Sequence, residues 1–431
     1  MIISSSVPSR PIGKPLIQIG SLDTFHMPAL QAGLAEEFDT EFYSTWSIRR
    51  TGPNPALPRT NAWALHYLLW IYKRFPWVQR SNKTYLPLCK AFDFWFTGRL
   101  RPDMDALYFL SGFGTAAMRK AHKWGKPVVV DSGSTHTDFQ HRIVWEEYQR
   151  NGLRSPLFPE AYRARIRQEF IEGDFIQIPS EFVKRTYLEE GIPESKILKA
   201  SYGADISGFP ARQRADVSPV FRAICPSGVN LRKGARVLVE SWRKLGWSPS
   251  EAELHWVGRP WPETHHLFRD PIPGLVWHDW MAHSELAALY RSCDVLVLPS
   301  FEEGLARVLI EAGASGLPPI ATPNTGVEDF FTPGDPEGWL IPCNDVDALC
   351  AALTEARANR DATFELGQRA AARARSGFSW EDYGRRVREN FRVVMGMSGP
   401  KILRQEEKET EIQPQIPRIG TNGVGRKPEP G

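Results

Sequence analysis

One stretch of the sequence, residues 294–326, constrains the fold more than any other. It reads DVLVLPSFEEGLARVLIEAGASGLPPIATPNTG. The apolar run at 295–298 lies between turn residues, which is typical of a strand buried on both faces of a parallel sheet. Apolar residues at three-to-four spacing over 304–314 predict an amphipathic helix packed on that sheet. Residues 320–322 complete a strand-helix-strand unit of the α/β class.

Two glutamates stand at the edge where such units bind ligands, beyond the carboxyl end of the first strand. Glu303 begins the predicted helix, and Glu311 lies roughly 12 Å further along its axis at about 1.5 Å per residue. That span fits a nucleotide-sugar whose diphosphate lies at the helix N-terminus, where N–H groups and the dipole attract anions and Gly304 permits close approach. Glu303 would then reach a sugar hydroxyl and Glu311 a ribose. Alternatively, both are ordinary helix-surface glutamates.

The same stretch resembles the donor-site motif of retaining GT-B glycosyltransferases of the family 4, or group 1, type. The residues that carry the resemblance are Pro299, Ser300, Glu303, Gly304, Glu311, Ala312, Gly316, Pro318 and Gly326. The resemblance implies an α/β chain with the GT-B fold, in which two Rossmann-like domains face an interdomain cleft. It also implies a catalytic role for Glu303 and donor binding by Gly304, Leu305 and Glu311.

The length of the chain favours two domains, since each half of 431 residues is long enough to bury its own core. A hydrophobic content of 42% is that of a soluble globular protein. We expect a flexible lead at 1–14, an acceptor domain at 15–212, a donor domain at 220–378, a closing helix at 379–398 that returns to the first domain, and a disordered tail at 399–431.

Composition excludes several classes of protein. The sequence holds no run of eighteen apolar residues and no secretory signal, so we expect a cytoplasmic protein. Its 5 cysteines include no C-x-x-C pair, which argues against a disulfide framework and a zinc site. A net charge of +3 gives no argument for nucleic acid. No G-x-G-x-x-G follows a predicted strand, which disfavours a dehydrogenase.

A basic pair opens a predicted helix in the second domain. Arg232 and Lys233 precede Gly234 and the helix at 235–245, where they are suited to holding diphosphate oxygens, although such a pair can also be merely solvated. The resemblance assigns phosphate binding to Lys233. The arginine that the family commonly has nearby is replaced by Val229, so Arg232 is a candidate substitute. These cations would stabilise a departing diphosphate, and we expect no metal and no cofactor.

Two loops of the first domain carry further candidates. Gly20 ends the strand at 16–19 and His26 follows, and both are acceptor-side candidates. Related enzymes often have two glycines in this loop, where this chain has only Gly20. His136 follows the buried strand at 126–131, and the resemblance places it near the transferred sugar as a catalytic candidate. Alternatively, His136 is a structural or surface histidine.

The segment 59–101 mixes aromatic and basic side chains. It contains Trp63, Trp70, Phe75, Trp77, Phe92, Trp95 and Phe96 among Lys73, Arg74, Arg80, Lys83, Lys90 and Arg99, with one acid, Asp93. Such a mixture suits an anionic bilayer or a lipid-linked acceptor, and therefore peripheral contact with the inner face of the membrane. The alternative is a pair of core-packed helices with solvated lysines.

The favoured function is a retaining glycosyltransferase that moves a sugar from a nucleoside-diphosphate-sugar to the hydroxyl of a glycan, a lipid or a small molecule. A nucleotide-sugar epimerase or a sugar phosphorylase would use the same fold. A third alternative is a catalytically inactive protein that binds sugars or nucleotides, in which the single glycine at Gly20 and Val229 would be marks of decay.

Overall fold

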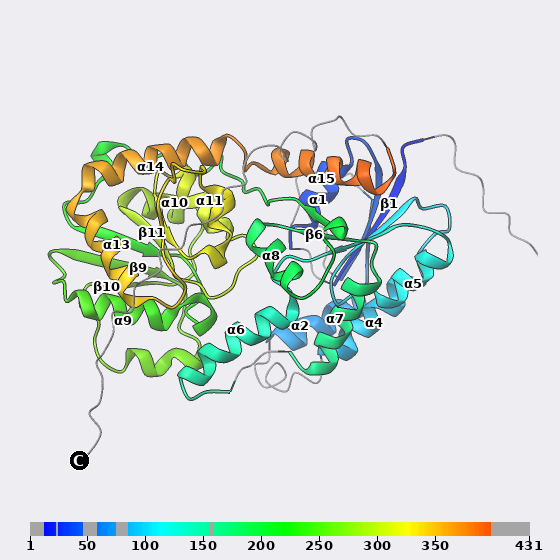
Figure 1. Ribbon diagram of the computed structural model, residues 1–431, viewed down its shortest axis with the longest axis horizontal. Coiled ribbons are helices and arrows are strands. Elements are labelled where there is room, and N and C mark those ends of the chain that lie inside the picture. Colours follow the sequence, from blue (N-terminus) through cyan, green and yellow to red (C-terminus); the bar gives the residue numbers. More distant parts are fainter. Residues whose placement is uncertain (1–12, 23–24, 46–57, 75–84, 155–157, 398–431) are drawn as a thin grey trace, which may run out of the picture.

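The structure is a computed structural model that describes residues 13–22, 25–45, 58–74, 85–154 and 158–397. It contains two parallel sheets with helices on both faces of each, side by side along the long axis of the molecule (Figure 1). The predicted two-domain α/β architecture is confirmed. The predicted disordered tail and all but the end of the predicted flexible lead lie outside the described residues.

The first sheet is 7-stranded, with the order β3-β2-β1-β4-β5-β6-β7. Its strands are β1 (Leu16–Ser21), β2 (Asp39–Ser44), β3 (Arg59–Asn61), β4 (Ala106–Leu110), β5 (Val128–Asp131), β6 (Phe175–Ile178) and β7 (Ile197–Lys199). The helices of this part are α1 (Met27–Leu34), α2 (Trp63–Arg74), α4 (Tyr85–Thr97), α5 (Thr115–Lys123), α6 (Thr137–Arg150), α7 (Glu160–Glu172) and α8 (Glu181–Glu189).

The second sheet is 6-stranded, with the order β10-β9-β8-β11-β12-β13. Its strands are β8 (Phe221–Cys225), β9 (Ala252–Val257), β10 (Leu275–His278), β11 (Val295–Leu298), β12 (Pro319–Ala321) and β13 (Trp339–Leu340). Its helices are α9 (Ala235–Leu245), α10 (His283–Ser292), α11 (Arg307–Ala314), α12 (Val327–Phe330), α13 (Val346–Ala358) and α14 (Arg360–Arg375).

Strand β11 shows why a continuous apolar run becomes the centre of a sheet. Val295 and Val297 join the core that α9 and α13 cover, whereas Leu296 and Leu298 join the core that α10, α11 and α14 cover. Successive side chains of a strand point to opposite faces, so a strand with helices on both faces needs apolar residues at every position. The sequence prediction for this strand is confirmed residue by residue.

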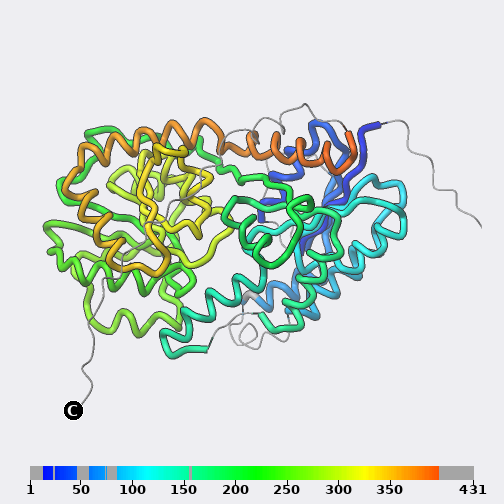
Figure 2. Tube along the Cα trace, viewed as in Figure 1, coloured from blue at the N-terminus to red at the C-terminus, as the bar shows by residue number. Residues whose placement is uncertain are grey.

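Two helices fasten the domains together. Helix α15 (Trp380–Val394) leaves the second domain and packs along α1, where Gly33 and Gly384 lie in backbone contact (Figures 1 and 2). Helix α6 follows β5 of the first sheet, yet Val144 and Tyr148 in its second half belong to the core of the second domain. The Tyr148 hydroxyl donates to Glu263 at 3.0 Å. The domains are therefore joined at two separate places.

The segment 59–101 begins with a short strand, β3, that the sequence analysis did not predict, and continues as two helices. Helix α4 packs Leu88, Phe92 and Phe96 into the core, as the helix-pair alternative required. The Phe96 ring occupies the space that a Cβ at Gly20 would need. Gly20 therefore serves packing in this structure. Phe75, Trp77, Arg80 and Lys83 lie outside the described residues.

Among the residues that the structure describes, no helix combines the length and the apolar character needed to traverse a bilayer.

Candidate functional site

A cavity of about 690 Å³ lies between the domains. The loops that follow β1, β4 and β5 of the first sheet line it together with the loops that follow β8 and β11 of the second. Each sheet reverses its strand order between two of these strands, β1 and β4 in the first and β8 and β11 in the second. Such switch points beyond the carboxyl ends are where open parallel sheets bind ligands.

Helix α11 begins at Arg307, not at Gly304 as the spacing predicted. The backbone before it is held in an extended loop, because Ser180 of the first domain donates to the Gly304 carbonyl at 2.7 Å and the Ala306 N–H donates to Thr325 at 3.0 Å. Glu303 therefore lies in this loop, ahead of the helix. These contacts join segments that are far apart in the sequence, so the local sequence pattern could not predict them.

Gly304 permits a close approach, but of the two domains rather than of a ligand. A Cβ at Gly304 would overlap the carbonyl oxygen of Gly133 in the loop after β5. The absence of a side chain at Gly304 therefore serves backbone packing across the interface, and its expected contact with a diphosphate stays a prediction.

Lys233 and Glu303 meet at the cavity wall. The Lys233 ammonium and the Glu303 carboxylate form an ion pair, and both residues line the cavity. The short turn that carries Lys233 is fixed by Asn230, whose side chain accepts from the Lys233 N–H at 3.0 Å, and by Gly234 in the left-handed conformation with φ +76°. A lysine and an acid from different loops of the second domain are therefore presented together.

The charge of the Lys233 ammonium is sensitive to its surroundings. Burial lowers the pKa of Lys233 to about 7, the Arg232 guanidinium adds to that lowering, and Glu302 opposes it. The adjacent Glu303 carboxylate also favours the charged form. Lys233 consequently depends on a neighbouring anion to remain an ammonium.

Arg232, the candidate for a second phosphate ligand, does not itself line the cavity. Its Nη1 donates to the carbonyl oxygen of Glu302 at 2.6 Å and to the Glu302 carboxylate at 3.0 Å. The same nitrogen lies 3.7 Å from the carboxylate of Glu303, which does line the cavity, and phosphate binding by Arg232 stays a prediction.

Glu302 is a residue that the sequence analysis missed. Its carboxylate is fully buried and accepts from Ser134 at 2.5 Å, from the Thr135 hydroxyl at 2.9 Å and from Gln140 at 3.0 Å, all in the first domain. Burial opposes ionisation, but Arg232 and these donors outweigh it and hold the pKa of Glu302 below its ordinary value. The sequence showed two adjacent acids and no means to tell which of them faces the other domain.

Glu311 and Leu305 line the cavity, as the resemblance implied. Burial raises the pKa of the Glu311 carboxyl, and Arg307 and His283 oppose that rise. Arg307, which the sequence analysis also missed, lines the cavity at the first position of α11. A cation therefore lies at a helix N-terminus, which itself favours anions, and an acceptor of hydrogen bonds lies about one turn further along the same helix.

His26 lies at the first-domain side of the cavity. Its Nε2 is 2.8 Å from Oδ2 of Asp131, the last residue of β5, and both side chains are buried. The ring packs 4.5 Å from that of Tyr202, which also lines the cavity. An imidazole paired with a carboxylate can orient a hydroxyl or hold a proton.

His136 does not line the cavity, although it follows β5 as predicted. It caps the N-terminus of α6, and its ring packs 5.5 Å from Phe170 and 5.2 Å from Tyr187. Burial is the largest influence on the pKa of His136 and lowers it. The geometry therefore agrees with the structural alternative for this residue.

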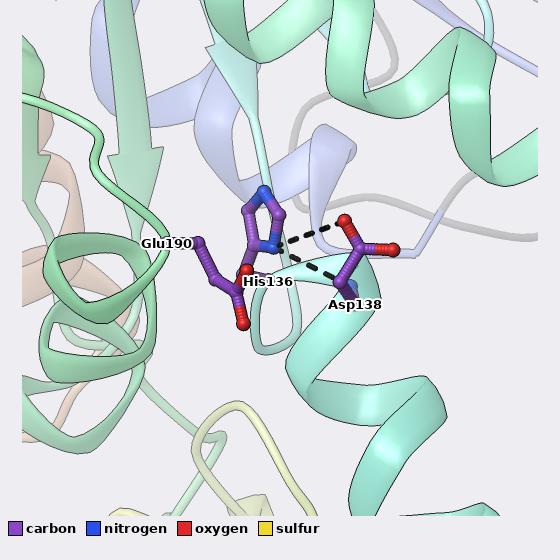
Figure 3. A group of neighbouring side chains, drawn as sticks. All are labelled: His136, Asp138 and Glu190. Carbon is purple, nitrogen blue, oxygen red and sulfur yellow. Dashed lines mark hydrogen bonds and ion pairs between the residues drawn. The ribbon is translucent and has the colours of Figure 1, made fainter.

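His136, Asp138 and Glu190 form a group with metal-ligand chemistry (Figure 3). Their ligand atoms lie within 4.8 Å of one another. However, Asp138 already pairs with Arg163 at 3.0 Å and with Arg167 at 2.6 Å. Glu190 pairs with Arg142 at 3.0 Å. Guanidinium groups already meet both carboxylates, so this group is an ion-pair cluster.

Comparison with known proteins identifies the second domain. Residues 221–359 match the family model described as "Glycosyl transferases group 1". A putative colanic acid biosynthesis glycosyltransferase, WcaL of Salmonella typhimurium, is 26% identical over 249 residues, which is 54% of this chain and 60% of WcaL. A D-inositol 3-phosphate glycosyltransferase of Paenarthrobacter aurescens is 34% identical over 122 residues, 27% of this chain and 28% of that protein. The chain thus spans less than two thirds of these curated relatives.

Solved structures share the whole two-domain fold. Sucrose-phosphate synthase from Thermosynechococcus elongatus superposes with a TM-score of 0.63 at 16% identity and covers 90% of this chain and 100% of its own. Anabaena HepE in complex with UDP-glucose superposes with a TM-score of 0.61 at 13% identity, covering 88% of this chain and 99% of its own. The GT-B fold predicted from the sequence is confirmed.

Replacement of Glu302 by alanine should destabilise the protein by about 3–5 kcal/mol, because it leaves Arg232 and three first-domain donors without their buried acceptor. The measurement is thermal unfolding of Glu302→Ala beside Glu146→Ala. The side chain of Glu146 is 51% exposed, so its removal should change stability by about 0.5 kcal/mol or less. Equal melting temperatures for the two variants would refute the bridging role of Glu302.

Proposed function

We propose, from the premise that this chain belongs to the group 1 glycosyltransferases, that it transfers a sugar from a nucleoside-diphosphate-sugar to an acceptor hydroxyl. The observation that carries the proposal is the convergence of Lys233, Glu303 and Glu311 on one cavity between two parallel sheets. These residues come from two loops and one helix of the matched domain, and each is a residue that the donor-site resemblance selects.

The second-domain end of the cavity supplies what a nucleoside diphosphate needs. Lys233 and Arg307 are cations beside the N-terminus of α11, and they would stabilise the charge that develops on the departing diphosphate. Glu303 would accept from sugar hydroxyls and Glu311 from the ribose. We propose that this charge compensation makes a metal and a cofactor unnecessary, so chelation by EDTA should leave turnover unchanged.

In the transfer step, the acceptor oxygen forms a bond to the anomeric carbon while the bond from that carbon to the diphosphate oxygen breaks. The proton of the acceptor hydroxyl passes to the diphosphate. We propose that the acceptor attacks on the leaving-group face, so the anomeric configuration is retained. His26, paired with Asp131 on the first-domain side, would orient the acceptor hydroxyl.

Two alternatives share this cavity. A nucleotide-sugar epimerase or a sugar phosphorylase would use the same donor end, and a binding protein would hold the donor without turnover. Slow release of nucleoside diphosphate from a single donor in a nucleotide-sugar panel supports a transferase. Binding without any release supports the binding protein. UDP-sugars are the first members of the panel, since HepE is solved with UDP-glucose.

We also propose peripheral contact with the cytoplasmic face of a membrane through α2. Trp63, Tyr67 and Trp70 on α2 are 57%, 65% and 54% exposed, and Phe94 on α4 is 82% exposed. Arg74, Lys90 and Arg99 on the same two helices or just after them are exposed cations. Sedimentation with liposomes that contain anionic lipid tests this contact, and equal recovery with neutral and anionic liposomes would contradict it.

Lys233→Ala and Glu303→Ala should each lower turnover by about 10²–10³-fold, because each removes a charge that faces the reacting diphosphate or sugar. The measurement is release of nucleoside diphosphate with the best donor of the panel. Lys244→Ala is the matched control, since the Lys244 side chain is 58% exposed on the far end of α9. Wild-type rates in both site variants would end the assignment, and an NMR coupling constant of the product reports the anomer.

Glu303→Gln should make binding of UDP weaken at a lower pH than in the wild type. Burial and Arg232 lower the pKa of Lys233 to about 7 with Glu303 in place, and removal of the Glu303 charge lowers it further, so the free variant loses the ammonium at a lower pH. A bound diphosphate favours the ammonium, and affinity should therefore fall by up to about tenfold per pH unit above the pKa of the free protein. Calorimetric titration with UDP measures this loss, which should begin at a higher pH in the wild type. Coinciding pH profiles for the two proteins would disprove the coupling.

A further inference from the structure

The cavity has a second end whose chemistry differs from that of the donor end. At the first-domain side its walls are apolar and mostly aromatic, and we name this region the aromatic chamber. Its residues are Tyr85, Leu110, Phe113, Phe158, Tyr162, Ile166 and Phe170. They come from α4, from β4 and the loop after it, and from α7 and the residue range that leads into it.

The rings of the aromatic chamber hold one another in place. Tyr85 stacks on Phe158 at 5.4 Å between ring centroids and meets Tyr162 edge-on at 5.3 Å. Phe158 and Tyr162 lie 4.6 Å apart. Aromatic pairs at these separations attract each other beyond simple burial. The chamber is therefore a preformed surface.

The loop that forms the floor of the chamber turns its polar backbone away from the cavity. Buried Glu169 accepts from the Gly112 N–H, from the Gly114 N–H at 3.2 Å and from the Thr115 hydroxyl at 2.6 Å. Arg165 donates to the Gly112 carbonyl at 2.8 Å. Gly112 has φ +92°, which favours glycine, and a Cβ there would press on the Tyr162 hydroxyl at 2.5 Å.

This arrangement decides what the chamber can bind. The N–H groups of Gly112 and Gly114 and the carbonyl of Gly112 already have partners in α7, so they offer a polar ligand little to replace the hydrogen bonds that it makes with water. An apolar group would instead gain free energy with each methylene removed from water. The chamber also borders the exposed apolar face of α2, because Tyr72 of α2 packs 5.1 Å from Tyr85.

We propose that the aromatic chamber binds an alkyl or aryl group of the acceptor, and that the acceptor is a hydroxyl compound with such a group attached rather than a free polar sugar. This proposal rests on the proposed function in one respect, namely that the hydroxyl of the bound acceptor lies at the donor end of the cavity and receives the sugar. Binding of the apolar group itself requires no donor and no turnover.

The test is a titration of the purified full chain with methyl, hexyl and octyl β-D-glucopyranoside below the micellar concentrations, with phenyl β-D-glucopyranoside as the aryl arm. Affinity should rise by about three- to fourfold per methylene. A rise with the alkyl series alone assigns an aliphatic group, and tighter binding of the phenyl compound than of the hexyl compound assigns an aryl group. Equal affinity of the methyl, octyl and phenyl compounds would overturn the proposal.

Tyr85→Ala and Phe158→Ala should flatten the dependence on chain length, whereas Ile171→Ala should not. Ile171 lies on the same helix as Tyr162 but is 64% exposed and outside the chamber, which makes it a matched control. UDP is titrated into the same proteins. If a chamber variant keeps its affinity for UDP while its affinity for the alkyl glucosides no longer rises with chain length, the apolar group binds in the chamber. If the wild type does not bind UDP at all, that result counts against the proposed function and leaves the chamber proposal standing.

A crosslink keeps the proposal testable should a chamber variant fail to fold. An octyl glucoside with a diazirine in its chain is activated on the wild type, and labelled peptides are found by mass spectrometry. Labels at 85, 110–113 and 158–170 support the chamber. Labels confined to other parts of the chain would refute it.

Discussion

The carboxylate of Glu302 is the contact on which the arrangement of the two domains depends. It is buried at the interface, where it joins Arg232 of its own domain to hydroxyl and amide donors of the other. A buried charge persists only when it is paired and hydrogen-bonded, so this carboxylate specifies the relative placement of the two loops that meet there. The neighbouring Gly304 allows the backbones to touch. Glu303 lies between these two interface residues, and its side chain faces the cavity.

Because of this contact, the two adjacent acids have different roles, and so do the two adjacent cations. Arg232 and Glu302 form the pair at the interface, whereas Lys233 and Glu303 form the pair at the cavity. One residue of each dipeptide supports the structure and the other faces the ligand space. For Glu302 and Glu303 such alternation is expected, because successive side chains of an extended loop point to opposite sides. Arg232 and Lys233 instead lie in one 3-10 turn, where successive side chains point in different directions around the turn axis.

The sequence predicted the strands best and the interdomain contacts least. β11 matches its predicted range because a run of buried apolar residues is a local signal. The start of α11 was predicted three residues early, since its loop is held by Ser180 from the other domain. The short strands β3 and β7 lack that apolar signal. Glu302 and Arg307 were missed because their surroundings arise only on folding, and His136 turned into the core for the same reason.

Helix α6 gives the molecule a mechanical property. It leaves the first sheet at the cavity, where Gln140 holds Glu302, and ends inside the core of the second domain with Val144 and Tyr148. Helix α15 spans the domains on the opposite side of the view in Figure 1. A wide swing about either helix would drag the other out of its packing. The motion that would leave both fastenings in place is a rotation about the line that joins them, which would widen the gap between the lobes on one side of that line and narrow it on the other.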